Sequence, residues 1–385
     1  MDFELSEDQI AFVNLAREFS DKELLPNAAA WDQEEVFPSD IVRKAGELGF
    51  CGLYVPEKAG GLGLSRLDAS LIFEQLAMGC TSTTAYLTVQ NMVVWIIATF
   101  AEKTIRKQWC QKLSQGEALA SYCLTESEAG SDAASLKTRA RLHGNHYVLN
   151  GSKAFISGAG SSDLLVVMAR TGGEGAKGIS AFAVDAKSEG IIYGRKERKM
   201  GWRSQPTRTV TFENVKVPAT ALLGSKGEGF KIAMQGLDGG RINIATCSIG
   251  TAQAALNHAS KYLLERSQFG QPLANFQALQ FKIADMATEL VAARQLVRMA
   301  AAKLDIDHPD KTTYCAMAKR FATDIGFKVA DEALQIFGGN GYIKDYPLER
   351  YLRDSRVHRI LEGTNEIMRI IIARRLLMSD TVDLL

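Results

Sequence analysis

Apolar residues recur every three or four positions through the first third of the chain, which is the period of a helix with one buried face. Ser6 and Gln9 have the spacing of a capping box, so a helix is predicted from there to near Pro26. Pro38 suits the first turn of a second helix, and Gly49 suits its end. Further helices are predicted over residues 67–78, 84–100 and 104–113. The first third is therefore predicted to be all-helical.

The period changes from about four residues to two near Ala118. Strands are predicted over residues 122–125, 136–142, 147–156, 164–169, 179–184 and 208–212, with turn signals such as Asn150-Gly151 and Asn214 between them. The helical period then returns over residues 230–264, 276–304, 309–337 and 364–378. The sequence thus predicts an α+β protein with a helical domain at 1–118, a small antiparallel β domain at 119–228 and a close-packed helical domain at 229–385.

Composition narrows the classes of partner. The 385 residues include 45 Lys+Arg and 44 Asp+Glu, so the formal net charge is +1 and no field of the whole molecule would attract nucleic acid or an anionic membrane. The most apolar run, residues 93–98, is far shorter than the roughly 20 residues of a membrane helix and is predicted to be buried. The six cysteines are scattered without a C-x-x-C pair, which argues against a metal site or a disulfide framework.

The start of the sequence bears on the compartment. No secretory signal and no Arg/Ser-rich transit segment opens the sequence, since Met1 leads directly into the first predicted helix. We therefore expect a cytoplasmic protein if the source is bacterial, and a mitochondrial matrix protein if this is the processed form of a eukaryotic chain.

A lone carboxylate lies just before the last predicted helix, and it is the candidate catalytic group. Thr364 or Asn365 is a good N-cap for that helix, and Glu366 suits its dipole. Glu362 therefore precedes a helix start, and Gly363 beside it leaves room for a flat ligand to approach the carboxylate and the local backbone amides. An exposed loop glutamate beside an ordinary cap is the alternative that these residues alone leave open.

Short motifs along the whole chain together resemble those of one protein family. They are residues 122–126, 129–132, 150–153, 155–157, 238–241, 266–270, 335–341 and 353–354. Each motif is weak alone, but in this order, within a helical–β–helical chain of this length, the set resembles the acyl-CoA dehydrogenase family of flavoenzymes. Among its subfamilies, residues 80–86, 151–160 and 204–208 look most like the isobutyryl-CoA dehydrogenases of valine breakdown.

The resemblance implies a fold and a cofactor. The C-terminal domain is expected to be a four-helix bundle, and FAD is expected to lie between the β domain and these helices. Hydroxyl donors at the flavin edge, such as Thr125, Ser131 and Ser157, would stabilise the charge that arrives with a hydride, although a strand threonine and turn serines are the plain alternative. The expected cofactor contacts are Tyr122, Cys123, Leu124, Thr125, Ser131, Phe155, Ile156, Ser157, Arg266, Gln277, Gln335, Gly338, Gly339, Thr364, Asn365 and Glu366. Of these, Arg266 resembles the ligand of the FAD diphosphate, and Gln277 and residues 335–339 resemble contacts across a subunit interface.

The same resemblance implies substrate contacts. Asp238 and Arg241 resemble positions on the helix that lines the acyl-CoA channel, with Ser131 and Gly363 as further contacts; a surface ion pair between Asp238 and Arg241 is the alternative. Some members carry their catalytic base immediately before that arginine, but this chain has Gly240 there. Glu362 is therefore the expected base.

The expected reaction is FAD-dependent α,β-dehydrogenation of a short branched-chain acyl-CoA, isobutyryl-CoA to methacrylyl-CoA. Glu362 would take the α-proton, its pKa raised by burial, while the β-hydrogen leaves as hydride to flavin N5. The resemblance also implies a homotetramer built as a dimer of dimers, and electron-transferring flavoprotein as acceptor. Alternatives left open are 2-methylbutyryl-CoA or a short straight-chain acyl-CoA as substrate, a flavin oxidase or monooxygenase on the same scaffold, and a non-catalytic helical scaffold or binding protein.

Overall fold

The computed structural model describes residues 4–378, so the outer ends of the predicted first and third domains lie outside the described residues. The N-terminal part is helical, as predicted, and Ser6 and Gln9 form the predicted capping box. Its helices are α1 (Glu7–Phe19), extended by a π-helical turn at Ser20–Leu24, α2 (Ala28–Glu34), α3 (Ser39–Glu47), α4 (Arg66–Gly79), α5 (Thr81–Phe100) and α6 (Lys103–Ser114).

Helix α5 lies in the core. It is much longer than the apolar run that the sequence suggested, and at 20 residues it is long and apolar enough to cross a membrane by length and composition alone. However, 72% of its most apolar window is buried against the rest of the chain. Such burial is typical of the core helix of a folded domain, and it agrees with the prediction of a buried helix.

The middle part is an eight-stranded sheet with strand order β6-β7-β3-β2-β4-β5-β8 and β1 beside β4. Most neighbours are antiparallel, as predicted, but β1 and β2 both pair with β4 in parallel, so the sheet is mixed. The strands are β1 (Ala120–Cys123), β2 (Arg139–His143), β3 (His146–Ser157), β4 (Leu164–Arg170), β5 (Ile179–Asp185), β6 (Ile191–Tyr193), β7 (Thr207–Pro218) and β8 (Leu222–Leu223).

The turns predicted at Asn150-Gly151 and Asn214 are wrong, because both lie inside long strands. The Asn150 side chain accepts a hydrogen bond from the Asn214 backbone N–H at 2.9 Å, and its amide donates to Asn214 Oδ1 at 3.1 Å. The register of β3 on β7 shifts between Leu149 and Gly151, which marks a β-bulge. A bulge and a turn both favour asparagine and glycine, so composition alone does not separate them.

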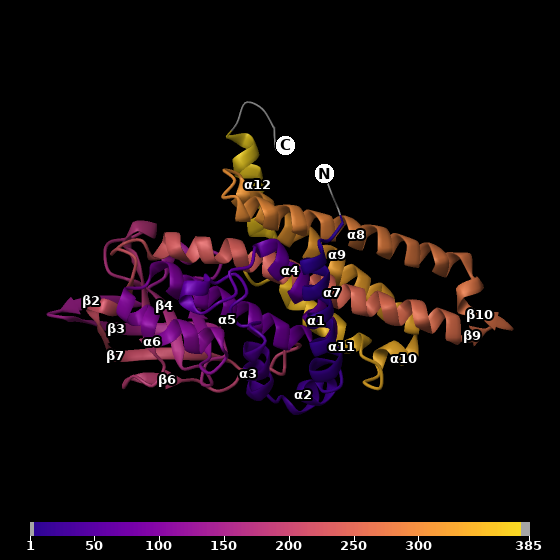
Figure 1. The fold of residues 1–385 in the computed structure, drawn as a ribbon, viewed down its shortest axis with the longest axis horizontal. Coiled ribbons are helices and arrows are strands. Elements are labelled where there is room, and N and C mark those ends of the chain that lie inside the picture. The colour runs from indigo at the N-terminus through magenta and orange to yellow at the C-terminus, as the bar shows by residue number, and fades with distance from the viewer. Residues whose placement is uncertain (1–3, 379–385) are drawn as a thin grey trace.

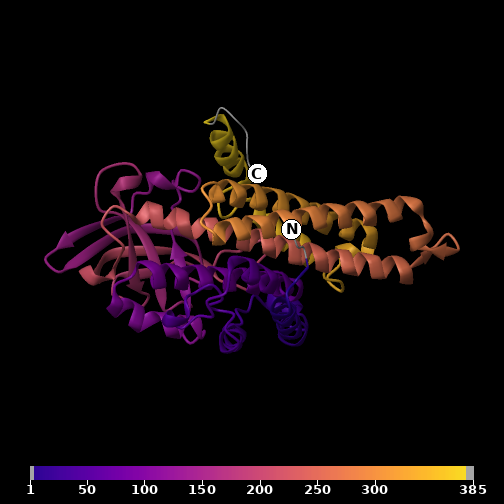
Figure 2. The same ribbon diagram turned by 45° about the horizontal axis from the view of Figure 1, so that its top comes forward.

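The C-terminal part is a helical bundle that extends away from the sheet (Figures 1 and 2). Its three longest helices pack on one another, α12 and α11 pack against α9, and α4 of the N-terminal part packs against α7 and α8. The elements are α7 (Gly229–Glu265), the hairpin β9 (Ser267–Gln268) and β10 (Gln271–Pro272), α8 (Gln277–Asp305), α9 (Lys311–Phe337), α10 (Gly339–Tyr342), α11 (Leu348–Arg356) and α12 (Asn365–Leu377).

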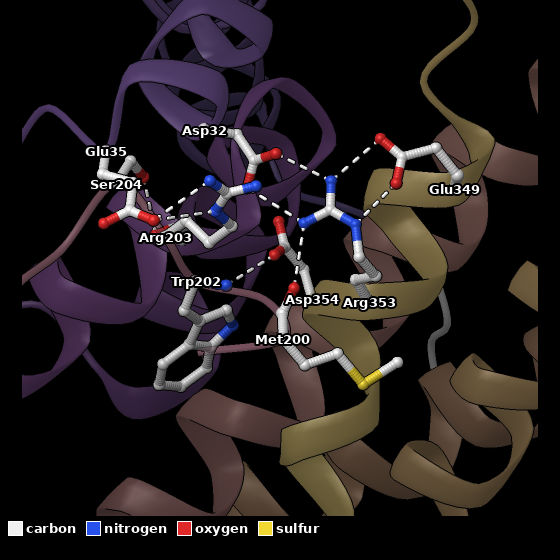
Figure 3. Close-up of polar contacts among 10 residues, drawn as sticks. Asp32, Glu35, Met200, Trp202, Arg203, Ser204, Glu349, Arg353 and Asp354 are labelled. Atoms are coloured by element: carbon white, nitrogen blue, oxygen red, sulfur yellow. Dashed lines mark hydrogen bonds and ion pairs between the residues drawn. The ribbon is translucent and has the colours of Figure 1, made fainter. Parts of the chain in front are cut away.

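Three parts of the chain meet in a cluster of polar contacts that we call the clasp (Figure 3). Its centre is Arg353 on α11, which donates to both carboxylate oxygens of Asp32 at 3.1 and 2.7 Å and to the Met200 carbonyl oxygen at 3.1 Å. The same guanidinium contacts both oxygens of Glu349 at 2.5 and 2.8 Å. A planar guanidinium suits such paired contacts, so one side chain joins an N-terminal helix, the segment before β7 and a C-terminal helix.

Two further contacts complete the clasp. Arg203 donates to Glu35 Oε1 at 3.3 and 3.0 Å, and the Trp202 backbone N–H donates to Asp354 Oδ1 at 2.6 Å. Burial raises the pKa of the Asp354 carboxyl to about 6, although the amide bond and neighbouring arginines oppose the rise. The clasp therefore holds the segment that carries Trp202 against α11.

Candidate active site

A cavity of about 610 Å³ lies where the sheet meets the segment that joins α11 to α12, and its size is in the usual range for a ligand site. Several residues predicted to contact a ligand line it together. They are Thr125, Ser131, Phe155, Ser157, Glu362, Gly363 and Thr364. The segments that contribute them are far apart in sequence, so the fold brings these residues to one place.

The other lining residues were mostly not predicted. They include Lys199, Met200, Gly201, Trp202 and Thr207, together with Arg353, Arg356, Val357, Ile360 and Leu361. The Lys199 ammonium donates to the Gln205 carbonyl oxygen at 2.7 Å and to Thr207 Oγ1 at 2.9 Å, which shapes this irregular segment. Burial lowers the pKa of Lys199 to about 8. Neither helical nor strand period marks residues 194–206, so only the motifs at 204–208 and 353–354 indicated any of these residues.

Glu362 lies in the loop immediately before α12. Its backbone φ is 57°, in the left-handed region, and Gly363 follows with φ 88°. Its Oε2 atom is buried without a hydrogen-bond partner. Burial raises the pKa of the Glu362 carboxyl to about 7, while the positive charges of Arg241 and Lys319 oppose the rise. A carboxyl with this pKa and a free oxygen is suited to accept a proton near neutral pH.

The carboxylate of Glu362 rests on Gly240 of α7. A Cβ atom at residue 240 would lie only 2.8 Å from Glu362 Cδ, which is closer than real Cβ contacts allow. Because residue 240 has no side chain, the Glu362 carboxylate can occupy the space beside it. Sequence reasoning identified Gly240 as a position without a base, and the structure gives it a steric role as well.

Asp238 and Arg241 are buried, at 5% and 4% exposure, so the surface ion pair that the sequence left open is wrong. Arg241 Nη1 donates to Asp238 Oδ1 at 2.6 Å, and Thr312 Oγ1 donates to Asp238 Oδ2 at 2.7 Å. Arg241 Nε also lies 3.5 Å from the carbonyl oxygen of Glu362. This face of α7 therefore supports the loop that carries the carboxylate.

Lys319 on α9 is a second support for that loop, and no sequence pattern indicated it. Its ammonium donates to the Gly363 carbonyl oxygen at 2.7 Å and to Asn365 Oδ1 at 2.9 Å. The Asn365 amide donates in turn to Thr323 Oγ1 and to Asp324 Oδ1, at 3.0 and 2.9 Å. The Asn365 side chain is thus engaged by α9 and does not line the cavity, and its expected contact to a cofactor stays a prediction.

The N-cap and the first turn of α12 agree with the prediction. Thr364, rather than Asn365, is the N-cap, because its hydroxyl accepts from the Ile367 backbone N–H at 3.3 Å. Glu366 is exposed in the first turn, where a negative charge suits the helix dipole.

A second cavity, of about 290 Å³, lies along α7 beside Asp238. The Arg66 guanidinium lines it, with Cζ 3.5 Å from the centre of the Tyr54 ring and 5.1 Å from that of Trp95. A Cβ atom at Gly239 would lie 3.0 Å from Arg66 Cζ. Consecutive glycines of α7 thus face Arg66 in this cavity and the Glu362 carboxylate beside the larger one.

Models of three protein domains match the chain in this same order. They are described as the N-terminal domain of acyl-CoA dehydrogenase, over residues 6–117, its middle domain, over residues 121–215, and its C-terminal domain, over residues 227–377. The chain belongs to the acyl-CoA dehydrogenase family. Members of this family are FAD-dependent oxidoreductases.

Curated relatives in the acyl-CoA dehydrogenase family are similar over nearly the whole chain. Mitochondrial isobutyryl-CoA dehydrogenase of Bos taurus is 54% identical over 97% of this chain and 90% of the relative, and that of Dictyostelium discoideum is 53% identical over 98% and 91%. The solved structure of butyryl-CoA dehydrogenase from Megasphaera elsdenii superposes with a TM-score of 0.95, at 39% identity, over 98% of this chain and all of that one. Matching relatives include both mitochondrial and bacterial enzymes.

Not every side chain expected to contact FAD faces the larger cavity. The side chains of Cys123, Leu124 and Ile156 belong to the hydrophobic core and do not line the cavity. The Tyr122 hydroxyl is buried without a partner, near enough to Glu362 and Arg241 for their charges to affect its pKa, which burial raises well above the usual value. For Cys123, Leu124 and Ile156 the structure leaves only backbone contacts to a flavin.

The expected phosphate and interface residues are exposed at the far end of the bundle. Arg266 and Gln277 flank the hairpin β9–β10 in sequence, and Gln335, Gly338 and Gly339 lie at the end of α9 and the start of α10. The hairpin points away from the sheet in Figure 1. A single chain does not bring these residues to the cavity beside Glu362. Sequence similarity alone predicted that these residues contact the FAD diphosphate or a neighbouring subunit, but it did not predict where they lie in the fold.

The larger cavity fits the flavin that this family uses. Three buried polar atoms on its walls or beside it lack a hydrogen-bond partner: Tyr122 Oη, Trp202 Nε1 and Glu362 Oε2. Buried polar groups are normally paired, so such a group of orphans marks a place where a ligand completes the bonding. Thr125 and Ser157 add hydroxyl donors, and Phe155, with φ 58° and 69% exposure, presents a ring at the rim.

Proposed function

We propose that this chain oxidises a short branched-chain acyl-CoA, isobutyryl-CoA to methacrylyl-CoA, with FAD as cofactor and Glu362 as the base that removes the α-proton. The observation that carries the proposal is the position of the Glu362 carboxylate. It lies between the cavity that fits a flavin and the α7 face that carries Asp238 and Arg241, and one of its oxygens has no partner. The similarity to isobutyryl-CoA dehydrogenases over nearly the whole chain supports the choice of acyl group.

The residues of the chain divide the work of the reaction. FAD, when bound in the larger cavity, supplies the hydride acceptor. Glu362 accepts the α-proton, for which its pKa of about 7 is suitable. A backbone amide of the loop beside Glu362 would donate to the thioester oxygen, where negative charge develops, and one such donor is typically worth about 3–4 kcal/mol. Arg241 and Lys319 hold that loop from two helices.

Two motifs that resemble the isobutyryl subfamily meet beside the base. Ser82 Oγ and Ser204 Oγ lie 2.7 Å apart, which joins the start of α5 to the segment before β7. Ala85, Trp202 and Ile244 form a small buried cluster, against which Leu361 and Val357 pack. A wall of this kind, directly next to Glu362, is consistent with a short acyl group.

The substrate assignment predicts an order of specificity. We expect kcat/KM to be highest for isobutyryl-CoA, with 2-methylbutyryl-CoA as the closest competitor, then butyryl-CoA, and octanoyl-CoA poorest. One methylene in an apolar pocket is worth about 1–3 kcal/mol, or roughly 10–200-fold. The measurement is kcat/KM for these four thioesters with one electron acceptor. If butyryl-CoA or octanoyl-CoA exceeds both branched substrates, the acyl preference is wrong although the dehydrogenase activity stands.

We also propose a homotetramer, a dimer of dimers in which Arg266 and Gly338-Gly339 of one subunit contact FAD held mainly by a neighbour. These residues are remote from the cavity of their own chain, and the same end of the bundle exposes large apolar side chains. Examples are Phe269, 93% exposed, Tyr342, 82% exposed, and Phe281, 61% exposed. Exposed aromatic groups of this kind mark interaction surfaces.

The assembly predicts a change in both mass and flavin content. Sedimentation of the FAD-loaded protein should give a tetramer, and Arg266→Met should release FAD more readily because it removes the bidentate partner of the diphosphate. Arg139→Met, an exposed arginine of β2, is the control and should retain FAD. An FAD-loaded monomer contradicts the proposed arrangement.

The electron acceptor and the compartment follow from the proposed reaction. We propose electron-transferring flavoprotein as acceptor, with the protein in the cytoplasm of a bacterium or, as a processed chain, in the mitochondrial matrix. Reduction of purified electron-transferring flavoprotein by the enzyme with isobutyryl-CoA, in the absence of oxygen, tests the acceptor. Rapid reoxidation of the reduced enzyme by oxygen alone contradicts it.

A further inference from the structure

Lys319 is a lysine whose whole side chain is buried inside the bundle, at 0% exposure. Its ammonium has two acceptors, both neutral: the Gly363 carbonyl oxygen at 2.7 Å and Asn365 Oδ1 at 2.9 Å. Among residues 4–378, it forms no ion pair with any carboxylate. Burial of an unpaired cation is costly, so a lysine at this position calls for a physical reason.

The two hydrogen bonds hold the loop that carries the proposed base. Glu362 and Gly363 are consecutive residues in the left-handed region, which is unfavourable for glutamate and persists only where the surroundings fix the backbone. Lys319 fixes the carbonyl of Gly363 from α9, and Arg241 approaches the carbonyl of Glu362 from α7. Two successive carbonyl groups of this loop are therefore held by cations from two helices.

Arg241 and Lys319 differ in the negative charge that lies nearest to them. Arg241 is neutralised by Asp238, at 2.6 Å, whereas the charge that most favours protonated Lys319 is that of Glu362. The groups that face Glu362 are Arg241 on α7, Lys319 on α9, Tyr54 before α4 and Tyr122 on β1. Those that face Lys319 are Glu362, Arg241, Asp324, Glu366 and His358.

We propose that Lys319 is a positioning residue for the dehydrogenation: it fixes the Glu362 loop through the Gly363 carbonyl, and its charge keeps the Glu362 carboxylate ionised until the substrate proton arrives. The proposal rests on the proposed function, because it assigns Glu362 as the base. Burial lowers the pKa of Lys319 to about 7 and raises that of Glu362 to about 7, because it disfavours the charged form of each group.

The sign of the effect is fixed by the charge. A positive neighbour lowers the pKa of a carboxyl, so loss of Lys319 raises the pKa of Glu362, and a larger share of the enzyme then carries a protonated, inactive base at neutral pH. A merely structural role of Lys319 would lower the rate by the same factor at every pH.

The test is Lys319→Met, which keeps the length of the side chain and removes the charge. Flavin reduction by saturating isobutyryl-CoA is followed by stopped-flow absorbance without oxygen, from pH 6 to pH 9. We expect a rate about fivefold lower than wild type at pH 7, with the deficit shrinking towards pH 9, because a rise of about one unit from a pKa of about 7 lowers the ionised fraction of Glu362 from about one half to about one eleventh. Lys319→Arg retains the charge and should restore the wild-type pH profile.

A matched control lies on the same helix. Lys328→Met removes an exposed lysine that pairs with Glu289 at 2.7 Å, and both its rate and its pH profile should equal those of wild type. An infrared titration of the Glu362 carboxyl, identified by its absence in Glu362→Gln, gives the same pKa shift without turnover. This readout separates failure of the inference from failure of the proposed substrate or reaction.

Two outcomes overturn the inference. One is a Lys319→Met enzyme whose infrared Glu362 pKa equals that of wild type. The other is a Lys319→Arg enzyme that folds but shows a raised Glu362 pKa, since its charge is retained.

Discussion

Glu362→Gln is expected to bind FAD and acyl-CoA as wild type does, and to reduce its flavin at least about 10²–10⁴-fold more slowly. The amide keeps the shape of the side chain but cannot accept the α-proton. The orphan Oε2 atom is the proton acceptor in this proposal, and no other carboxylate lines the cavity among the described residues. The measurement is bleaching of the flavin absorbance on mixing with isobutyryl-CoA without oxygen.

The control for this variant is Glu18→Gln, which makes the same chemical change on the exposed face of α1, where Glu18 pairs only with Lys22. It should reduce its flavin at the wild-type rate. A Glu362→Gln enzyme that bleaches nearly as fast as wild type means that the base is another group.

Since the pKa of Glu362 is raised to about 7, the rate of flavin reduction by the wild-type enzyme should fall as the pH decreases through that value, because the base becomes protonated.

Gly240→Ala is expected to lower flavin reduction by about 10²-fold without weakening the fold. The added methyl group would lie 2.8 Å from Glu362 Cδ, so the carboxylate must move, and a misplacement of about 1 Å costs roughly this factor. Alanine is also the better residue inside a helix, by about 1 kcal/mol. A fall in rate with unchanged or raised thermal stability therefore separates the loss of geometry from a loss of folding.

A glycine with open space provides the comparison for that variant. No atom outside the neighbouring residues lies within 4 Å of a Cβ placed on Gly173, so Gly173→Ala should leave flavin reduction unchanged. Full activity in Gly240→Ala would mean that the carboxylate occupies a different position when substrate is bound. The same steric argument explains why residues 240 and 362 cannot both carry a carboxylate in this site.

The sequence predicted the elements whose burial has a regular period, and it missed those held by polar contacts. Helices α4 to α9 and the long strands follow apolar periodicity closely. Helix α11 was missed because most of its residues are polar or charged, and charged side chains are buried there by polar contacts, as Asp354 is by the bond from the Trp202 backbone N–H. Sequence pattern cannot identify such burial, because the partners belong to distant segments.

The site residues also include some that the sequence indicated and some that it did not. Glu362 could be found because a glycine and a helix cap surround it, and motifs that resemble the family raised its importance. Lys319 and Trp202 have no local signal, because their roles depend on contacts with residues 44 and 152 positions away in sequence. The sequence could not exclude a surface ion pair between Asp238 and Arg241, because their burial depends on the packing of α4 and α5 against α7.

The clasp around Arg353 has a consequence for how the protein is built. Its carboxylates come from α2 and α11, and its backbone contacts come from the segment before β7, so no single part of the chain contains a complete set of partners. Arg353, Met200 and Trp202 also line the larger cavity. The position of these lining residues therefore depends on contacts from all three parts, and we expect a fragment that lacks any one of them to bind FAD less well.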